Sequence, residues 1–135
     1  MLASLCHELG ISDNVNFTGN VENAKMKKLY DHADIYLNSS RVDNQPVSIL
    51  EAFACGLPVV STSVGGIPYM TRHGEDAMLA PNEDAAQLAE HMVTLLRDDA
   101  LCARLIRQAR SRIQDHSWAP IYSKLLGLYH DESPT

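Results

Sequence analysis

The sequence has only three cysteines, and their wide spacing does not suit a disulfide framework or a zinc site. Cys6, Cys55 and Cys102 are odd in number and form no C-x-x-C pair. Disulfide-rich secreted domains and zinc ribbons need cysteines in close pairs. We therefore expect no disulfide framework, no metal site and a reducing, cytoplasmic location.

Positive charge is also scarce. Eleven Lys and Arg residues stand against seventeen Asp and Glu residues, for a net charge of −6. A nucleic-acid-binding domain normally carries a basic face, so nucleic acid is not expected as a partner. A small anionic ligand remains compatible with this charge, because backbone amides can hold a phosphate group without any basic residue.

The chain has no apolar run of about 18 residues, so no membrane-spanning helix is expected. Its first residues, "MLASLCHELG", lack the basic start and long apolar stretch of a signal peptide.

Strand and helix patterns alternate along the chain. Short apolar runs predict strands at 15–19, 34–39, 57–63 and 77–81. Helical spacing predicts helices at 22–32, 46–55, 83–97 and from 98 to about 115. Such alternation is typical of parallel sheets with right-handed crossovers. The expected fold class is therefore α/β, an incomplete Rossmann-like parallel sheet of about four strands flanked by helices, with a C-terminal helical segment.

Capping residues suggest where the helices begin and end. Gly56 is expected to end the 46–55 helix in a left-handed conformation. Asn82 is expected to cap the 83–97 helix, Asp98 or Asp99 the next one, and Ser117 a last one.

The chain begins on a helical pattern with no strand before it. A parallel sheet that starts in this way leaves its first strand as an exposed edge, which proteins normally cover. We expect self-association through this edge or through an exposed apolar face.

Glu51 is the only charged residue between Asp43 and Arg72. Asp43 belongs to the loop before the 46–55 helix, and Glu51 stands about two turns into that helix. Carboxylates accept hydrogen bonds from hydroxyls, and helix N-terminal amides donate to phosphate. A sugar nucleotide offers both kinds of group. The structural alternatives for Glu51 are an ion pair with Arg41 or Arg72, or a partly exposed position on the helix. Asp43 or Asn44 could simply cap the helix.

Four stretches carry a family resemblance: "NVNFTGNV", "ADIYLNSS", "DNQPVSILEAFACGLPVVSTSVGGIP" and "HGEDAMLAP". In order and spacing they resemble the retaining, GT-B-fold glycosyltransferases of group 1, family 4. The resemblance implies that residues 1–130 form a partial C-terminal nucleotide-sugar-binding domain, with a frayed tail at 131–135. It further implies transfer of a sugar from a nucleoside diphosphate sugar to an acceptor hydroxyl.

The resemblance also implies roles for single residues. Glu51 would bind the donor's ribose hydroxyls, and the backbone amides of Val47 and Ser48 would face the diphosphate. The donor sugar would be contacted by Asp43, Asn44 and Gln45. The base pocket would be lined by Thr18, Gly19, Asn20 and Val21. No metal and no cofactor beyond the donor are implied.

Two departures from the family pattern concern the donor sugar. Position 43 is Asp where the family has Glu, and position 44 is Asn where glycine is usual. Both substitutions bear on which sugar is bound more than on the class of reaction.

The matching stretches all belong to the family's C-terminal domain. The family's N-terminal domain, which binds the acceptor, would be the partner of this chain. We therefore expect the isolated chain to be inactive in transfer, and the full-length parent to be cytoplasmic and peripheral to the membrane. The alternative is a noncatalytic nucleotide-binding module or a remnant fragment.

Overall fold

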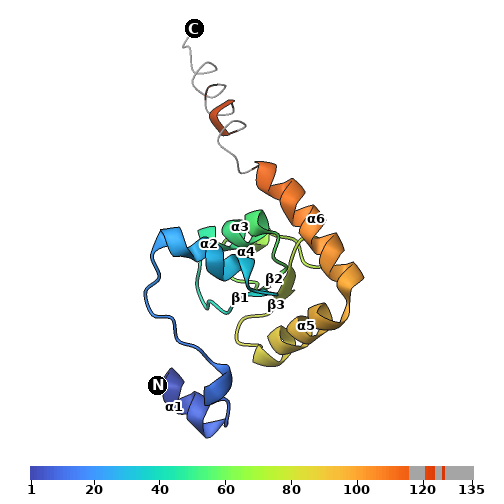
Figure 1. Cartoon of the computed structure of the whole chain (residues 1–135). Helices are drawn as coiled ribbons and strands as arrows, with labels where there is room; N and C mark the ends of the chain where they lie inside the picture. Colours follow the sequence, from blue (N-terminus) through green and yellow to red (C-terminus); the bar gives the residue numbers. More distant parts are fainter. Residues whose placement is uncertain (116–120, 124–125, 127–135) are drawn as a thin grey trace.

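The computed structural model describes residues 1–115, 121–123 and 126 (Figure 1). The helices are α1 (Leu2–Glu8), the 3-10 turn η1 (Ser12–Asn14), α2 (Asn23–Asp31), α3 (Val47–Cys55), α4 (Ile67–Met70), α5 (Ala85–Arg97) and α6 (Asp99–Asp115). The strands are β1 (Tyr36–Asn38), β2 (Val59–Thr62) and β3 (Met78–Ala80). The α/β class is confirmed.

The strands form one parallel sheet in the order β1-β2-β3. Leu37 of β1 aligns with Val60 of β2, and Ser61 of β2 aligns with Leu79 of β3. Because all three strands run the same way, the loops that follow them meet at one edge of the sheet, where such folds bind ligands.

The expected strand at 15–19 was wrong, so the described sheet has three strands instead of about four. This segment connects η1 to α2 and pairs with no described strand (Figure 1). Its apolar side chains are exposed, with Val15 at 36% and Phe17 at 56%. Apolar/polar alternation shows that a segment could join a sheet. A strand forms only where an adjacent strand accepts and donates its backbone hydrogen bonds. The edge strand of the described sheet is therefore β1.

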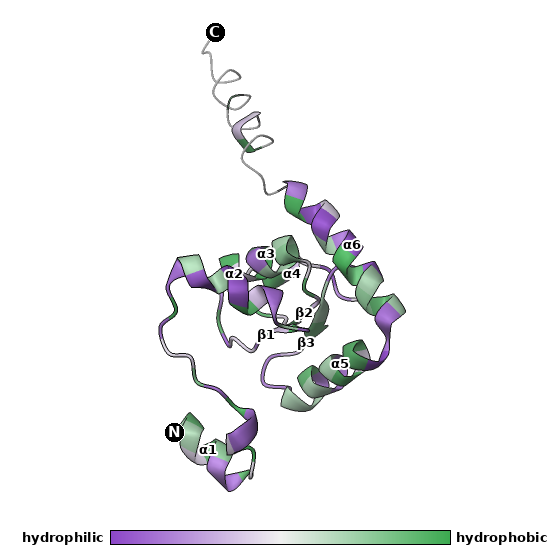
Figure 2. Ribbon diagram, in the orientation of Figure 1, coloured by the Kyte–Doolittle hydropathy of each residue, from purple (hydrophilic) through white to green (hydrophobic). Residues whose placement is uncertain are grey.

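Helices cover both faces of the sheet (Figure 2). Val59 belongs to a core with Ile49 and Phe53 of α3, and Val60 belongs to a second core with Leu95 and Leu105 of α5 and α6. Adjacent residues of β2 thus face opposite layers, and all four of its residues are buried. This confirms the expectation from its continuous apolar run.

The helix ends follow the sequence with one exception. Gly56 ends α3 with φ 75° and ψ 29°, as expected. Asp98 caps α6, because its Oδ1 accepts from the Leu101 amide at 2.8 Å. Asn82 does not cap α5; Asp84 does, accepting from the Gln87 amide at 2.9 Å. The chain turns through Glu83 at φ 62° before α5 begins, which moves the cap two residues along. Ser117 and the 131–135 tail lie outside the described residues.

No helix in the described ranges is long and apolar enough to cross a membrane. The N-terminal helix α1 has exposed apolar residues, among them Leu2 at 65% and Leu5 at 49%. Self-association through such a surface stays a prediction.

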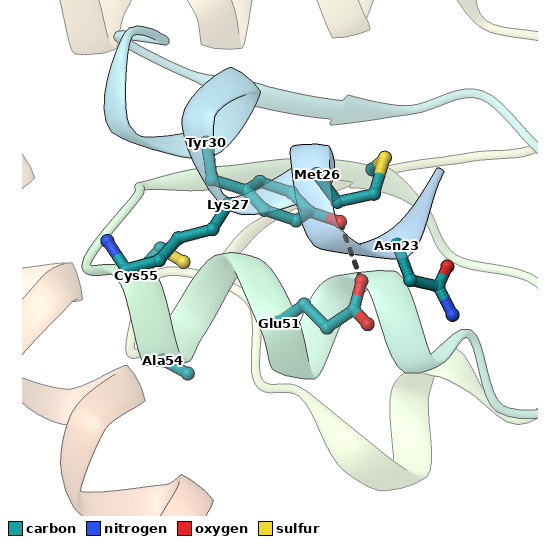
Figure 3. A pocket seen from close by; sticks show the side chains of 7 residues that line it. All are labelled: Asn23, Met26, Lys27, Tyr30, Glu51, Ala54 and Cys55. Carbon is teal, nitrogen blue, oxygen red and sulfur yellow. Dashed lines mark hydrogen bonds between the residues drawn. The ribbon is translucent and has the colours of Figure 1, made fainter. Parts of the chain in front are cut away.

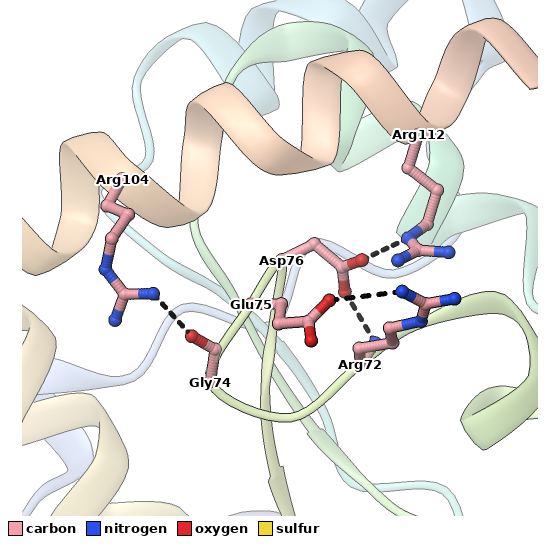
Figure 4. A network of polar contacts seen from close by, with 6 residues as sticks. All are labelled: Arg72, Gly74, Glu75, Asp76, Arg104 and Arg112. Carbon is pink, nitrogen blue, oxygen red and sulfur yellow. Dashed lines mark hydrogen bonds and ion pairs between the residues drawn. The ribbon is translucent and has the colours of Figure 1, made fainter.

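A buried carboxylate attaches α6 to the loop before β3 (Figure 4). Asp76 is 1% exposed and forms an ion pair with Arg112 of α6. Its other oxygen, Oδ1, accepts from the Arg72 amide at 2.7 Å. About two turns earlier on α6, Arg104 donates to the Gly74 carbonyl at 2.8 Å. Both oxygens of Asp76 are therefore satisfied, as a buried charge requires.

Replacing Asp76 with Ala should lower the free energy of unfolding by about 3–5 kcal/mol, because Arg112 then loses its partner. Denaturant unfolding followed by circular dichroism measures the change. Glu75→Ala is the matched control: Glu75 pairs with Arg72 on the surface, and its loss should cost less than about 1 kcal/mol. Equal costs for the two variants would contradict the structural role of Asp76.

Candidate functional site

The loops that follow β1 and β2 touch each other at the carboxyl edge of the sheet. The Gly66 amide donates to the Asp43 carbonyl at 3.0 Å. A Cβ at Gly66 would lie 1.5 Å from the Asn44 carbonyl oxygen, and one at Gly65 would lie 2.0 Å from that of Asp43. Only glycine fits at either position. This pair of glycines holds the loop that precedes α3 in place.

Polar side chains fix the start of the same loop. Asn38, at the end of β1, is buried, and its Oδ1 accepts from the Ser40 hydroxyl at 2.7 Å. Thr62, at the end of β2, donates to the Ser40 carbonyl at 2.6 Å. Hydrogen bonds therefore hold this loop at Ser40, near its start, and at Asp43, before α3. Its outer residues Asn44 and Gln45 are exposed, whereas Asp43 is half-buried.

The N-terminus of α3 follows directly and is not capped by a side chain. Its N-cap residue is Pro46, and no side chain accepts a hydrogen bond from the first turn. The alternative that Asp43 or Asn44 caps this helix is therefore wrong. The Ser48 hydroxyl accepts from Tyr36 at 2.7 Å, so the Ser48 side chain is held in place beside its own amide.

Glu51 lies on the outer face of α3, although its sequence neighbours are apolar. Ile49, Ala52 and Phe53 are all 0% exposed, whereas Glu51 is exposed. The helix thus turns its apolar residues to the core and its carboxylate outward. The ion pairs considered for Glu51 were wrong: Arg41 pairs with Glu83 and Arg72 with Glu75.

Tyr30 of α2 holds the Glu51 side chain. Its hydroxyl donates to Glu51 Oε2 at 2.8 Å. Tyr30 is 7% exposed, and this burial, followed by the hydrogen bond to Glu51, raises the pKa of the Tyr30 phenol. The phenol therefore stays protonated and remains a donor at physiological pH. Oε2 of Glu51 is engaged by this bond, and the carboxylate keeps acceptor capacity for a ligand.

Glu51 and Tyr30 line a pocket of about 230 Å³ between α2 and α3 (Figure 3). Its lining residues are Asn23, Met26, Lys27 and Tyr30 of α2 and Glu51, Ala54 and Cys55 of α3. Sequence reasoning missed the contributions of Asn23 and Tyr30. The signal for Tyr30 was its position on the apolar stripe of α2, because a buried tyrosine hydroxyl normally has a partner.

The residues expected to bind the base do not line this pocket. Thr18, Gly19 and Asn20 are exposed and Val21 is half-buried, in the segment that leads into α2. The pocket residue Asn23 begins that helix. The expected base-binding segment therefore enters α2 at the end that carries Asn23, and its role stays a prediction.

Together these groups offer two kinds of recognition. The carboxylate of Glu51 accepts hydrogen bonds, and the free amides at the start of α3 donate them with the positive end of the helix dipole. The arrangement suits a ligand that carries both hydroxyl groups and a negative charge.

Comparison with known proteins matches residues 1–112 to the family described as glycosyl transferases group 1. The D-inositol 3-phosphate glycosyltransferase of Corynebacterium efficiens is 31% identical over 95% of this chain and 30% of its own length. The N-acetyl-alpha-D-glucosaminyl L-malate synthase of Bacillus anthracis is 30% identical over 96% of this chain and 34% of its own length.

Solved structures show the same fold. Sucrose-phosphate synthase from Thermosynechococcus elongatus is 28% identical with a TM-score of 0.85, over 96% of this chain and 33% of that one. Anabaena Alr3699/HepE in complex with UDP has a TM-score of 0.88 at 23% identity, over 96% of this chain and 36% of that one. The chain spans about a third of the length of these curated relatives and structures.

Replacing Gly66 with Ala should displace the loop at 43–45, because the new methyl group would meet the Asn44 carbonyl. We expect a loss of about 1–3 kcal/mol in the free energy of unfolding and shifted amide resonances at residues 43–45. Gly74→Ala is the control, since Gly74 has φ 74° but open space around its Cα. It should cost about 1–2 kcal/mol through backbone strain and leave the 43–45 amides unmoved. Unmoved amides in Gly66→Ala would contradict the contact.

Proposed function

Because this chain belongs to the group 1 glycosyl transferases, we propose that it binds the nucleoside diphosphate sugar donor of a retaining enzyme. The whole protein would transfer the sugar from this donor to an acceptor hydroxyl, with the acceptor site on the part of the relatives' length that this chain does not span. The isolated chain would bind the donor without transferring it. Uridine diphosphate is the first nucleotide to test, because HepE was solved with UDP and with UDP-glucose.

The observation that carries this proposal is the oriented carboxylate of Glu51. Its bond from Tyr30 fixes the side chain before any ligand arrives. The ribose of a nucleotide has neighbouring hydroxyls that can both donate to one carboxylate. Hydrogen bonds to a charged group contribute about 1.5–3 kcal/mol each.

The diphosphate would lie at the N-terminus of α3. The amides of Val47 and Ser48 belong to its uncapped first turn. They would donate to the phosphate oxygens and, during transfer, stabilise the negative charge that develops on the departing nucleoside diphosphate. Pro46 has no N–H and shapes only the approach of the loop.

The donor sugar would be contacted by the loop residues Asp43, Asn44 and Gln45. The bond from Gly66 to the Asp43 carbonyl supports this role, because it holds the loop without using the side chains. For the base, the segment Thr18, Gly19, Asn20 and Val21 would form the pocket. Its support is that α2, which follows it, places Asn23 in the pocket with Glu51.

Glu51→Ala should weaken UDP binding by about 2–3 kcal/mol, the scale of lost hydrogen bonds to a charged group. Isothermal titration calorimetry on the 135-residue chain measures this change. The matched control is Glu90→Ala, which removes an exposed carboxylate from α5 on the other face of the sheet. It should bind UDP as the wild type does.

Thermal unfolding of the same variants separates binding from stability. Glu51→Ala should melt only moderately earlier than the wild type, because the Tyr30 hydroxyl loses its acceptor at a cost of about 1–3 kcal/mol. A variant that melts much earlier yet binds UDP normally would make Glu51 a structural residue and refute its proposed role.

A further inference from the structure

A second pocket lies between Arg72, in the loop before β3, and helix α6, on residues that the proposed donor site does not use. Figure 4 shows two of its residues, Arg72 and Arg112. Its volume is about 200 Å³, and it is lined by Arg72, Gln108, Ser111 and Arg112. All four side chains can donate hydrogen bonds, and no carboxylate is among the lining residues. We propose that this pocket binds a phosphate group.

Both arginines of the pocket have an acidic partner, but neither partner uses all of the arginine's donor groups. Asp76 is buried, and its two oxygens are occupied by Arg112 Nε and by the Arg72 amide. Arg112 therefore keeps its terminal nitrogens for a ligand. Glu75 pairs with Arg72 over 3.4 Å at the exposed surface, the kind of contact that a stronger anion replaces at little cost.

The helix behind the pocket concentrates positive charge on an otherwise acidic protein. Helix α6 has four arginines, and its only acidic residues, Asp99 and Asp115, stand at its two ends, in a chain of net charge −6. Two of these arginines have a structural role: Arg104 donates to Gly74, and Arg110 packs against Gly56 at the C-terminus of α3. Arg107 is exposed and has no acidic partner among the described residues, so it adds to the positive potential of this face.

The chemistry of the four side chains favours phosphate over a simple halide. Guanidinium groups bind phosphate through paired, charge-assisted hydrogen bonds, and a hydroxyl and an amide can satisfy its remaining oxygens. Such a group could belong to a free phosphorylated compound or to a phospholipid headgroup. Both sources present the same phosphate oxygens to the pocket.

The test is a titration of the 135-residue chain with inorganic phosphate at constant ionic strength, followed by amide NMR. The wild type should show saturable shifts at residues 72, 108, 111 and 112. Gln108→Glu places a carboxylate in the pocket and should weaken this binding at least about tenfold, because like charges are brought together. Gln114→Glu is the matched control: it makes the same change on an exposed part of α6 that does not line the pocket, and it should bind as the wild type does.

Sedimentation with vesicles identifies the source of the phosphate group. Binding to phosphatidic acid vesicles, but not to phosphatidylcholine vesicles, with a loss specific to Gln108→Glu, assigns a lipid headgroup. Saturable binding of inorganic phosphate without vesicle binding assigns a free phosphate compound. The proposal is refuted if neither probe shows a loss specific to Gln108→Glu, or if both variants weaken binding equally, which would indicate only general charge attraction. That result would not contradict the proposed binding of UDP at Glu51, because the two sites have no residue in common.

Discussion

The contact on which the site depends is the close approach of the Gly65–Gly66 turn to the backbone of Asp43 and Asn44. It joins the loops after β1 and β2, which the parallel sheet has already brought to the same edge. Because there is no side chain at either glycine, the two backbones can meet at hydrogen-bonding distance. The start of α3 is thereby fixed without a capping side chain, and its first amides remain free. The anion binding that we propose for this site would thus depend on the contact between these two loops.

The two faces of helix α3 have different roles, one in the stability of the fold and the other in the proposed binding of a ligand. Its inner face supplies Ile49 and Phe53 to the core, whereas its outer face presents Glu51 to the pocket beside α2. Tyr30 connects the two roles, since its ring is part of the core and its hydroxyl holds the carboxylate. A carboxylate that is already oriented loses less side-chain freedom when a ligand binds, and this favours affinity.

Local patterns in the sequence predicted most of the fold, and contacts between distant segments account for what they missed. The run at 57–63 predicted the buried central strand, and Gly56 predicted the end of α3, because both depend on neighbouring residues alone. The segment at 15–19 has an equally good strand pattern, but pairing requires a partner that no local pattern can supply. For the site, the spacing of Asp43 and Glu51 indicated that one carboxylate lies in the loop before α3 and the other on α3 itself. The hydrogen bond from Tyr30 and the contact of Gly66 with Asp43 were not visible, because each joins residues more than twenty positions apart.

We propose above all that a nucleoside diphosphate binds between the start of α3 and Glu51. The most direct test of this proposal is a map of amide chemical shifts as UDP is added to the isotope-labelled chain. The account predicts that the largest saturable shifts fall on Val47, Ser48 and Glu51, with the amide of Tyr30 also affected through its bond to the carboxylate. Saturable shifts confined to another face of the sheet, with the first turn of α3 unmoved, would contradict it.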